Sequence, residues 1–114
     1  MDASTWALPY FGIFEPDDPR VVATMEAVES RLMVSGEHGG LARFEGDTYQ
    51  LRQSDVDLAS AGNPWFLCTL WLAQYQLLRA KELADLIQPL AILDKVSRAA
   101  QVSGVLAEQI DPSS

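Results

Sequence analysis

The sequence has little of what several common kinds of site require: one cysteine and one histidine among 114 residues. Cys68 has no partner for an internal disulfide, and one Cys with one His falls short of a zinc site. The acidic residues do not follow the spacing of a calcium loop, and the glycines lack the Lys and Ser/Thr of a phosphate loop. We therefore predict no metal and no cofactor, with Cys68 buried in packing and His38 at the surface.

Positive charge is also scarce. Eight Lys and Arg stand against 16 Asp and Glu, so the formal net charge is −8 and the isoelectric point is about 4.4. Without a basic stripe to neutralise phosphates, nucleic acid and anionic membranes are disfavoured as partners. No apolar run reaches the roughly 18 residues of a membrane span. The N-terminus lacks the basic and apolar regions of a signal peptide, which favours a cytoplasmic protein, although such a signal would lie at the start of any longer parent.

The chain does contain enough apolar residues for one small globular domain, because 48 % of its residues are hydrophobic and 21 % are charged. From Arg20 to about Val34, apolar residues recur at steps of three and four, which predicts an amphipathic helix capped by Asp18 with Pro19 in its first turn. Met1–Gly12 is expected to be a short buried helix ended by Pro9 and Gly12. An apolar element this early suggests a cut through a larger domain.

A second helix is expected from Pro64 to about Ala80, with Asn63 as its cap. The residues that follow Pro64 are almost wholly apolar, so this helix should be internal. A further helical segment, Lys81–Gln101, should break near Pro89 because proline removes a donor. Leu41–Ser60 shows neither helical nor strand period and is predicted to be a binding loop. The sequence thus predicts an all-α fold of three or four helices.

Three features could carry chemistry. Arg43 offers five donors in a rigid fork that suits hydroxyls or carboxylates, or else forms a salt bridge to Glu45 or Asp47. Trp65, like Trp71 and Tyr75 deeper in the helix, could stack on a sugar ring or simply fill the core. Glu108 lies among apolar residues, where burial would raise the pKa of its carboxyl for acid or base work, or it faces solvent.

Three ordered motifs add a family resemblance. Arg43–Tyr49 reads Arg-Phe-Glu-Gly-Asp-Thr-Tyr, Asn63–Leu70 reads Asn-Pro-Trp-Phe-Leu-Cys-Thr-Leu, and Ser103–Pro112 surrounds Glu108. Together they resemble the glucoamylase family of glycoside hydrolases, family 15. The resemblance implies an (α/α)6 barrel several times longer than this chain. Residues 1–114 would then be a C-terminal fragment of that catalytic domain.

The resemblance also implies an activity, the hydrolysis of terminal α-glucosidic bonds of α-glucans with inversion. Inversion uses two carboxyl groups about 6.5–9.5 Å apart. By resemblance Glu108 is the general base, Arg43 holds the sugar hydroxyls, Trp65 lies near the outer substrate sites, and Asp47 and Tyr49 are pocket residues. No residue here matches the family's general acid, so the chain alone is expected to be inactive.

Two departures affect the outer sites. Gly46 stands where fungal members carry a glutamate, and Gln50–Gly62 is longer than the fungal connection.

Two alternative functions stay open: a non-catalytic module that binds sugar or regulates a partner, and an all-α dimerisation domain. We also expect self-association through an exposed apolar face of the helix Asn63–Ala80, because monomers rarely expose such a patch.

Overall fold

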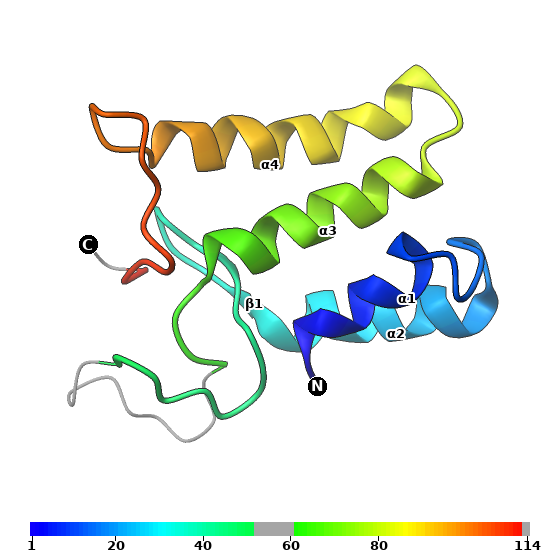
Figure 1. Ribbon diagram of the computed structural model, residues 1–114, viewed down its shortest axis with the longest axis horizontal. Helices are drawn as coiled ribbons and strands as arrows, with labels where there is room; N and C mark the ends of the chain where they lie inside the picture. The colour runs from blue at the N-terminus through cyan, green and yellow to red at the C-terminus, as the bar shows by residue number, and fades with distance from the viewer. Residues whose placement is uncertain (52–60, 113–114) are drawn as a thin grey trace.

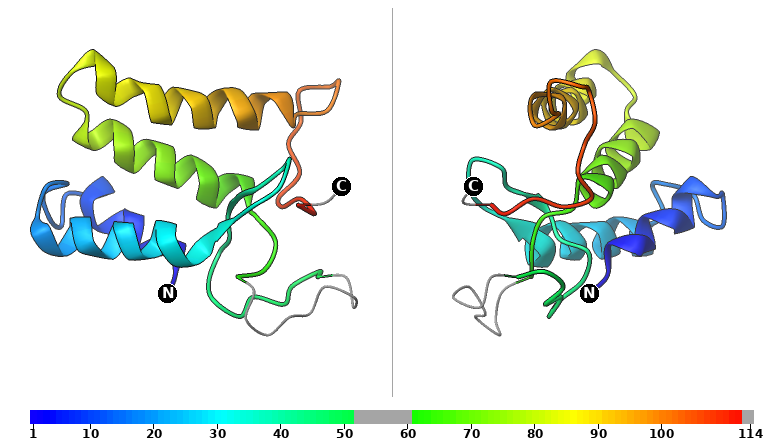
Figure 2. Two further views of the ribbon diagram at one scale, coloured as in Figure 1. Left: turned by 180° about the vertical axis from the view of Figure 1, so that it is seen from behind. Right: turned by 60° about the vertical axis from the view of Figure 1, so that its left-hand side comes forward.

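The computed structural model describes residues 1–51 and 61–112, and these form a layered stack of helices (Figures 1 and 2). The middle layer is α3 (Phe66–Arg79). On one side of it lies α4 (Ile87–Arg98), and on the other lie α1 (Ala7–Tyr10) and α2 (Pro19–Leu32). Short 3-10 helices precede α1 and α4: η1 (Ala3–Trp6) and η3 (Leu83–Leu86). The prediction of a mostly helical fold is confirmed, and closure into a barrel stays a prediction.

The spacing of apolar residues in α2 gave its buried face correctly. Val21, Met25, Val28 and Leu32 are all buried. Asp18 caps the helix, because its Oδ1 accepts a hydrogen bond from the Arg20 N–H at 2.9 Å, and a proline follows as the first helical residue. These side chains join one core with residues from η1, from the end of the hairpin and from Trp65 and α3: Ala3, Trp6, Leu41, Ala42, Trp65, Cys68, Leu72 and Tyr75.

A small hairpin follows α2, and the sequence did not indicate it. The helix ends at Leu32 rather than near Val34, and β1 (Met33–Val34) pairs antiparallel with β2 (Gly40–Leu41). Two residue pairs make the whole sheet, Met33 with Leu41 and Val34 with Gly40. The predicted binding loop Leu41–Ser60 begins at the last residue of β2, and its residues 52–60 lie outside the described part of the chain.

The predicted start of α3 is wrong. The helix begins at Phe66, with Trp65 as an extended N-cap residue that makes no side-chain capping bond. Pro64 is extended too, since it forms an antiparallel bridge with Ala42. Pairing with the hairpin therefore outweighs the local capping signal of Asn63. The expected exposure of residues 65–72 is also wrong for most of them: Trp65, Phe66, Cys68 and Leu72 are buried, and Leu67 is half exposed.

Two prolines do not end helices as predicted. Pro9 lies inside α1, and Pro89 is the third residue of α4, which continues to Arg98. The chain accommodates Pro89 by changing from η3 to α4 two residues earlier, so that its ring lies in the first turn of the α-helix, where proline is tolerated. The interruption falls instead before η3, where Asp85 Oδ2 accepts from the Lys81 N–H and the Glu82 N–H at 2.9 and 3.1 Å.

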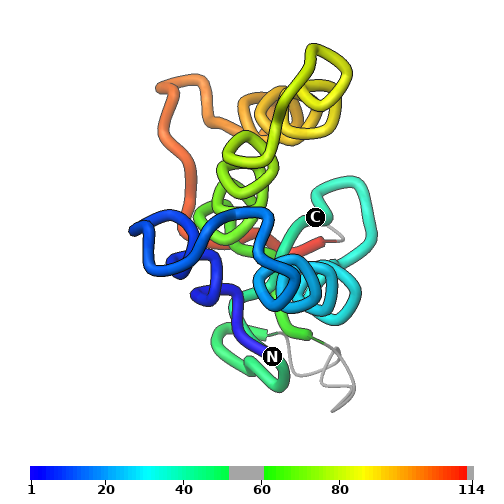
Figure 3. The backbone as a smooth tube through the Cα atoms, turned by 90° about the vertical axis from the view of Figure 1, so that its right-hand side faces the viewer, coloured from blue at the N-terminus to red at the C-terminus, as the bar shows by residue number. Residues whose placement is uncertain are grey.

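After α4 the chain turns back towards the start of α3. Figures 1 and 3 show this C-terminal segment, drawn in orange and red, running from the end of α4 to the beginning of α3. The loop that follows β2 reaches the same end of the molecule. The fold therefore brings these two irregular segments together at one end of the stack.

Within the described ranges, no helix is long and apolar enough to cross a bilayer.

Candidate functional site

A row of short extended segments, paired by isolated β-bridges, forms the framework at this end. Asp2 bridges Phe44, Ala42 bridges Pro64, and Trp65 bridges Gln109. Main-chain hydrogen bonds hold the last two steps: the Trp65 N–H donates to Leu41 O at 2.9 Å, and the Phe66 N–H donates to Glu108 O at 3.2 Å. The segment around Trp65 therefore lies between the segment that carries Arg43 and the one that carries Glu108. All three predicted motifs meet here.

Thr69 locks the row onto α3. Its hydroxyl donates to Trp65 O at 2.8 Å and accepts from the Leu41 N–H at 2.9 Å. The hairpin can come this close because position 40 is glycine, whose Cβ, if present, would stand 2.5 Å from Thr69 Oγ1. Both bonds are buried, and through them the Thr69 hydroxyl and the Leu41 N–H keep hydrogen-bond partners although they are removed from water. Sequence reasoning missed this role of Thr69, whose one local signal is its position four residues after Trp65.

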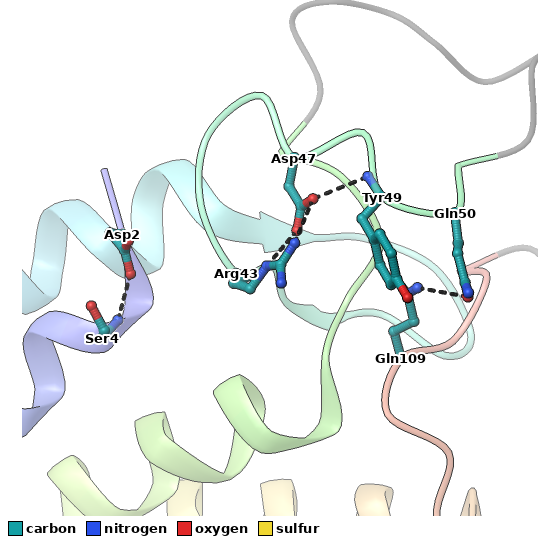
Figure 4. Close-up of polar contacts among 7 residues, drawn as sticks. All are labelled: Asp2, Ser4, Arg43, Asp47, Tyr49, Gln50 and Gln109. Atoms are coloured by element: carbon teal, nitrogen blue, oxygen red, sulfur yellow. Dashed lines mark hydrogen bonds and ion pairs between the residues drawn. The ribbon is translucent and has the colours of Figure 1, made fainter.

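Arg43 is fixed at both its backbone and its side chain. Its carbonyl accepts from the Ala3 N–H at 2.9 Å. Its guanidinium donates to the carboxylate of Asp47 twice, from Nε to Oδ2 at 2.9 Å and from Nη2 to Oδ1 at 3.0 Å (Figure 4). Hydrogen bonding to Asp47 raises the pKa of Arg43, and the nearby charge of Glu108 adds to the effect. The salt-bridge alternative for Arg43 is thus present, with Asp47 as the partner.

Asp47 is the buried member of this pair, with 3 % of its side chain exposed against 36 % for Arg43. Its Oδ1 also accepts from the Tyr49 N–H at 3.1 Å, so the carboxylate orders the loop as well as the guanidinium. A buried carboxylate with three such bonds has its charge well compensated. Gly62 makes room for it: a Cβ there would meet Asp47 O at 2.4 Å, and its φ of +92° favours glycine.

Aromatic rings surround the guanidinium. Arg43 Cζ lies 4.3 Å from the centroid of the Trp65 ring, 4.8 Å from that of Phe44 and 5.6 Å from that of Tyr49. These distances are those of cation–π contacts. Trp65 is 5 % exposed, so in this structure it supports Arg43 rather than presenting an open face. Phe44 had not been singled out from the sequence, although its position next to Arg43 was a signal.

The remaining predicted residues lie as follows. Glu108 is exposed rather than buried among its apolar neighbours. Its place is set by its backbone, whose carbonyl accepts from the start of α3. Trp71 stacks on Trp6 with centroids 5.1 Å apart, and Tyr75 is buried, which places both in the core rather than at the site. Burial raises the pKa of the Cys68 thiol to about 12, and His38 is half-buried in the hairpin turn.

An apolar hollow adjoins this cluster without containing it. A cavity of about 240 Å³ lies between the hairpin turn, the start of α3 and the end of α4, and Trp65 forms part of its wall. Arg43, Asp47, Tyr49 and Glu108 do not line it. We take the arginine cluster as the candidate site because it unites charged donors with ordered partners. Among the described residues, no three His, Cys, Asp or Glu side chains gather as a metal site would need.

Comparisons with known proteins agree with this framework. The family model described as glycosyl hydrolases family 15 matches residues 1–112. An uncharacterized glycosyl hydrolase of Methanocaldococcus jannaschii is 34 % identical over 76 residues, which are 66 % of this chain and 10 % of that protein. Trehalase 1 of Sulfolobus acidocaldarius is 29 % identical over 112 residues, which are 97 % of this chain and 17 % of that protein.

The chain therefore spans less than a fifth of the length of these two curated relatives. No solved structure matches it significantly. The family match includes the segments of Arg43, Trp65 and Glu108, which the row of β-bridges brings side by side. On the strength of that match, which covers nearly every residue, the chain belongs to glycosyl hydrolase family 15.

Proposed function

We propose that this chain supplies the base side of the active site of an inverting α-glucoside hydrolase. In this proposal Glu108 is the general base, and Arg43, Asp47, Tyr49 and Trp65 form the sugar-binding side. The observation that carries it is the order of the paired segments, with Arg43 on one side of the Trp65 segment and Glu108 on the other. Neighbouring extended segments lie about 4.8 Å apart, so the segments of Arg43 and Glu108 lie about 10 Å apart, with the Trp65 segment between them.

Arg43 is suited to hold sugar hydroxyls. Its two bonds to Asp47 use two of the five N–H donors of a guanidinium, which leaves three for a ligand. The side chain is one-third exposed, so those donors are accessible from one side. Asp47 and the rings of Trp65 and Tyr49 hold the guanidinium in place before substrate arrives, which lowers the conformational entropy lost on binding.

Glu108 is suited to activate water. Its carboxylate is exposed and, in this proposal, accepts a proton from the water that attacks the anomeric carbon. The bond to the leaving oxygen breaks as the new bond to water forms, and a second carboxyl must protonate that oxygen. We assign this second carboxyl to a part of the catalytic domain beyond this chain, consistent with the small share of the curated relatives that the chain covers.

The specificity is proposed at the level of terminal α-linked glucose. One relative is named a trehalase and the other a glycosyl hydrolase. Trehalose and α-glucans both present an α-linked glucose whose hydroxyls Arg43 could bind. Hydrolysis of trehalose, maltose and dextran by a protein that contains the complete domain would decide between them.

The test of the proposal uses Glu108. In a protein that contains the complete domain, Glu108→Gln should lower kcat by about 10²–10⁴-fold and leave KM nearly unchanged, because the amide keeps the shape but cannot accept the proton. Glu37→Gln, an exposed glutamate of the hairpin turn, is the matched control and should have wild-type kcat. A wild-type rate for Glu108→Gln would remove Glu108 from the base role.

The origin of the general acid has its own test. Reading the same genomic strand upstream should reveal the remainder of a family 15 domain with a glutamate-containing acid motif. If no such segment is encoded nearby, the catalytic proposal fails for this chain, and calorimetry with glucose or maltose would then distinguish a sugar-binding module from an interaction domain. The 114-residue chain itself should not hydrolyse maltose.

A further inference from the structure

Gln50 stands out in the loop between the hairpin and α3. Its φ is +55°, in the left-handed region, and among the described residues no other non-glycine residue has a positive φ. A left-handed conformation costs free energy for a residue with a side chain, and it persists where surrounding contacts impose it. Gln50 is exposed, so core packing does not explain it. Its hydrogen bonds supply the explanation.

Gln50 contacts two segments distant in sequence. Its side-chain Oε1 accepts from Gln109 Nε2 at 3.1 Å, across 59 residues of sequence (Figure 4). Its backbone carbonyl accepts from Asn63 Nδ2 at 3.4 Å. Gln50 also follows Tyr49, whose N–H is bound by Asp47. One residue thus connects the loop of the Arg43–Asp47 pair with the segment of Glu108 and with the segment that precedes Trp65.

The orientation of the Gln109 side chain depends on this bond. Gln109 Oε1 is buried and accepts no hydrogen bond from the described residues, so none of them holds the amide in place through that oxygen. The backbone of the Gln109 segment is held on its other side, where the Ile110 N–H donates to Pro64 O at 3.1 Å. Without Gln50, the bonds to the start of α3 would hold the segment alone, and they should open more often because the direct bond to the arginine loop is lost.

We infer that Gln50 is a positioning residue, which holds the Glu108 segment against the arginine loop through its hydrogen bond to Gln109. The inference rests on the proposed function, because its consequence is the relative placement of the base and the sugar-binding arginine. It assigns no contact with substrate to Gln50. Its left-handed backbone directs the side chain across to Gln109 while the preceding residues keep their bonds to Asp47.

Three variants separate the side chain from the backbone. Gln50→Leu has a similar size and no acceptor, so the bond is lost. Gln50→Asn tolerates the left-handed backbone better than most residues but is one methylene shorter. Gln50→Glu keeps an acceptor at the same distance and should restore the bond. The chain used is the 114-residue protein, and folding is checked from its helical circular dichroism.

The first measurement is amide hydrogen exchange, which needs no ligand. In Gln50→Leu and Gln50→Asn, protection of the Ile110 amide should fall about threefold to tenfold, the loss expected for one hydrogen bond. Gln50→Glu should retain wild-type protection, and the Val28 amide in α2 should be unchanged throughout. Wild-type protection of Ile110 in Gln50→Leu would overturn the inference, and so would an equal loss at Val28, which would mean general destabilisation.

The second measurement is calorimetric binding of 1-deoxynojirimycin, a protonated sugar mimic that can interact with a carboxylate and present hydroxyls to an arginine. The Leu and Asn variants should bind it about threefold to tenfold more weakly than wild type, and the Glu variant should recover the affinity. Equal affinity in all four proteins would overturn the inference while leaving the proposed function in place. A wild-type protein that does not bind would count against the proposed function, and the exchange measurement would still decide on Gln50.

Discussion

Replacement of Asp47 by asparagine is the most direct test of the arginine cluster. Asp47 is buried and accepts three hydrogen bonds, two of them from Arg43. Asparagine keeps one acceptor oxygen but turns an N–H donor towards the guanidinium. A hydrogen bond to a charged group contributes about 1.5–3 kcal/mol. Solvent screens the pair because Arg43 is one-third exposed, so we expect Asp47→Asn to lower the free energy of unfolding by about 2 kcal/mol.

Urea unfolding followed by circular dichroism at 222 nm measures this change, with an unchanged m-value as the sign that the two-state description holds. The corresponding fall in Tm should be about 6–12 °C for a domain of this size. Asp94→Asn is the matched control, because Asp94 pairs with Arg98 at 2.8 Å while both side chains are mostly exposed. Its loss should be below about 0.5 kcal/mol. If the two variants lose equal stability, burial of Asp47 does not matter and the reasoning is refuted.

Four further predictions concern other residues. Gly62→Ala should lower the free energy of unfolding more than Gly46→Ala, because both glycines have positive φ but only the first would bring a Cβ into contact, 2.4 Å from a carbonyl oxygen; equal losses in urea titrations would contradict this. Burial raises the pKa of Cys68 to about 12, whereas a free thiol has a pKa of about 8.5. Cys68 should therefore react with iodoacetamide at pH 8 about 10³-fold more slowly than a free thiol. Fast labelling of the folded protein would contradict its burial. Hydrogen bonds from Arg20 lower the pKa of the Asp18 carboxyl to about 2. Its carboxylate therefore stabilises the fold at pH values above about 4, the pKa of Asp in the unfolded chain. Tm should fall as the pH drops from about 4 to 2, and it should fall less in Asp18→Asn. Four apolar side chains of η3 and α4 are exposed: Leu83, Ile87, Leu90 and Leu93. Self-association through them should be weakened by Ile87→Glu in sedimentation equilibrium, and a wild-type protein that stays monomeric at all concentrations would contradict it.

The parts of the fold that the sequence predicted well are those governed by local periodicity. The spacing of Val21, Val22, Met25, Val28, Leu32 and Met33 predicted an apolar helical face, and Asp18 with Pro19 predicted its start. Four of the six side chains are buried, whereas Val22 is partly exposed and Met33 is exposed beyond the end of the helix. The errors came where a distant segment competes with a local signal. Asn63 and Pro64 form a good capping pair, but Pro64 is drawn into a bridge with Ala42, and this pairing cannot be read from neighbouring residues.

The candidate site shows the same division. The motifs predicted Arg43 and Glu108 as site residues, which stays a prediction, and the nearness of Asp47 in sequence already raised the ion pair that the structure contains. The order of the segments, with Trp65 between the other two, depends on main-chain pairing between residues distant in sequence, Ala42 with Pro64 and Trp65 with Gln109, and has no local signal. Pro89 was misjudged for a related reason: its effect depends on where the helix begins, which the Lys81–Asp85 turn sets.

The ends of the long connection between Tyr49 and Asn63 are fastened together. Gln50 O accepts from Asn63 Nδ2, and Gly62 lies directly against the Asp47 main chain. Because these contacts already hold the ends in place, doubling the length of the intervening stretch should cost only about 0.6 kcal/mol of closure entropy. The scaffold is thus open to grafting: loops of different length and composition can be exchanged between Leu51 and Ala61 while the segments of Arg43 and Glu108 stay paired with the Trp65 segment.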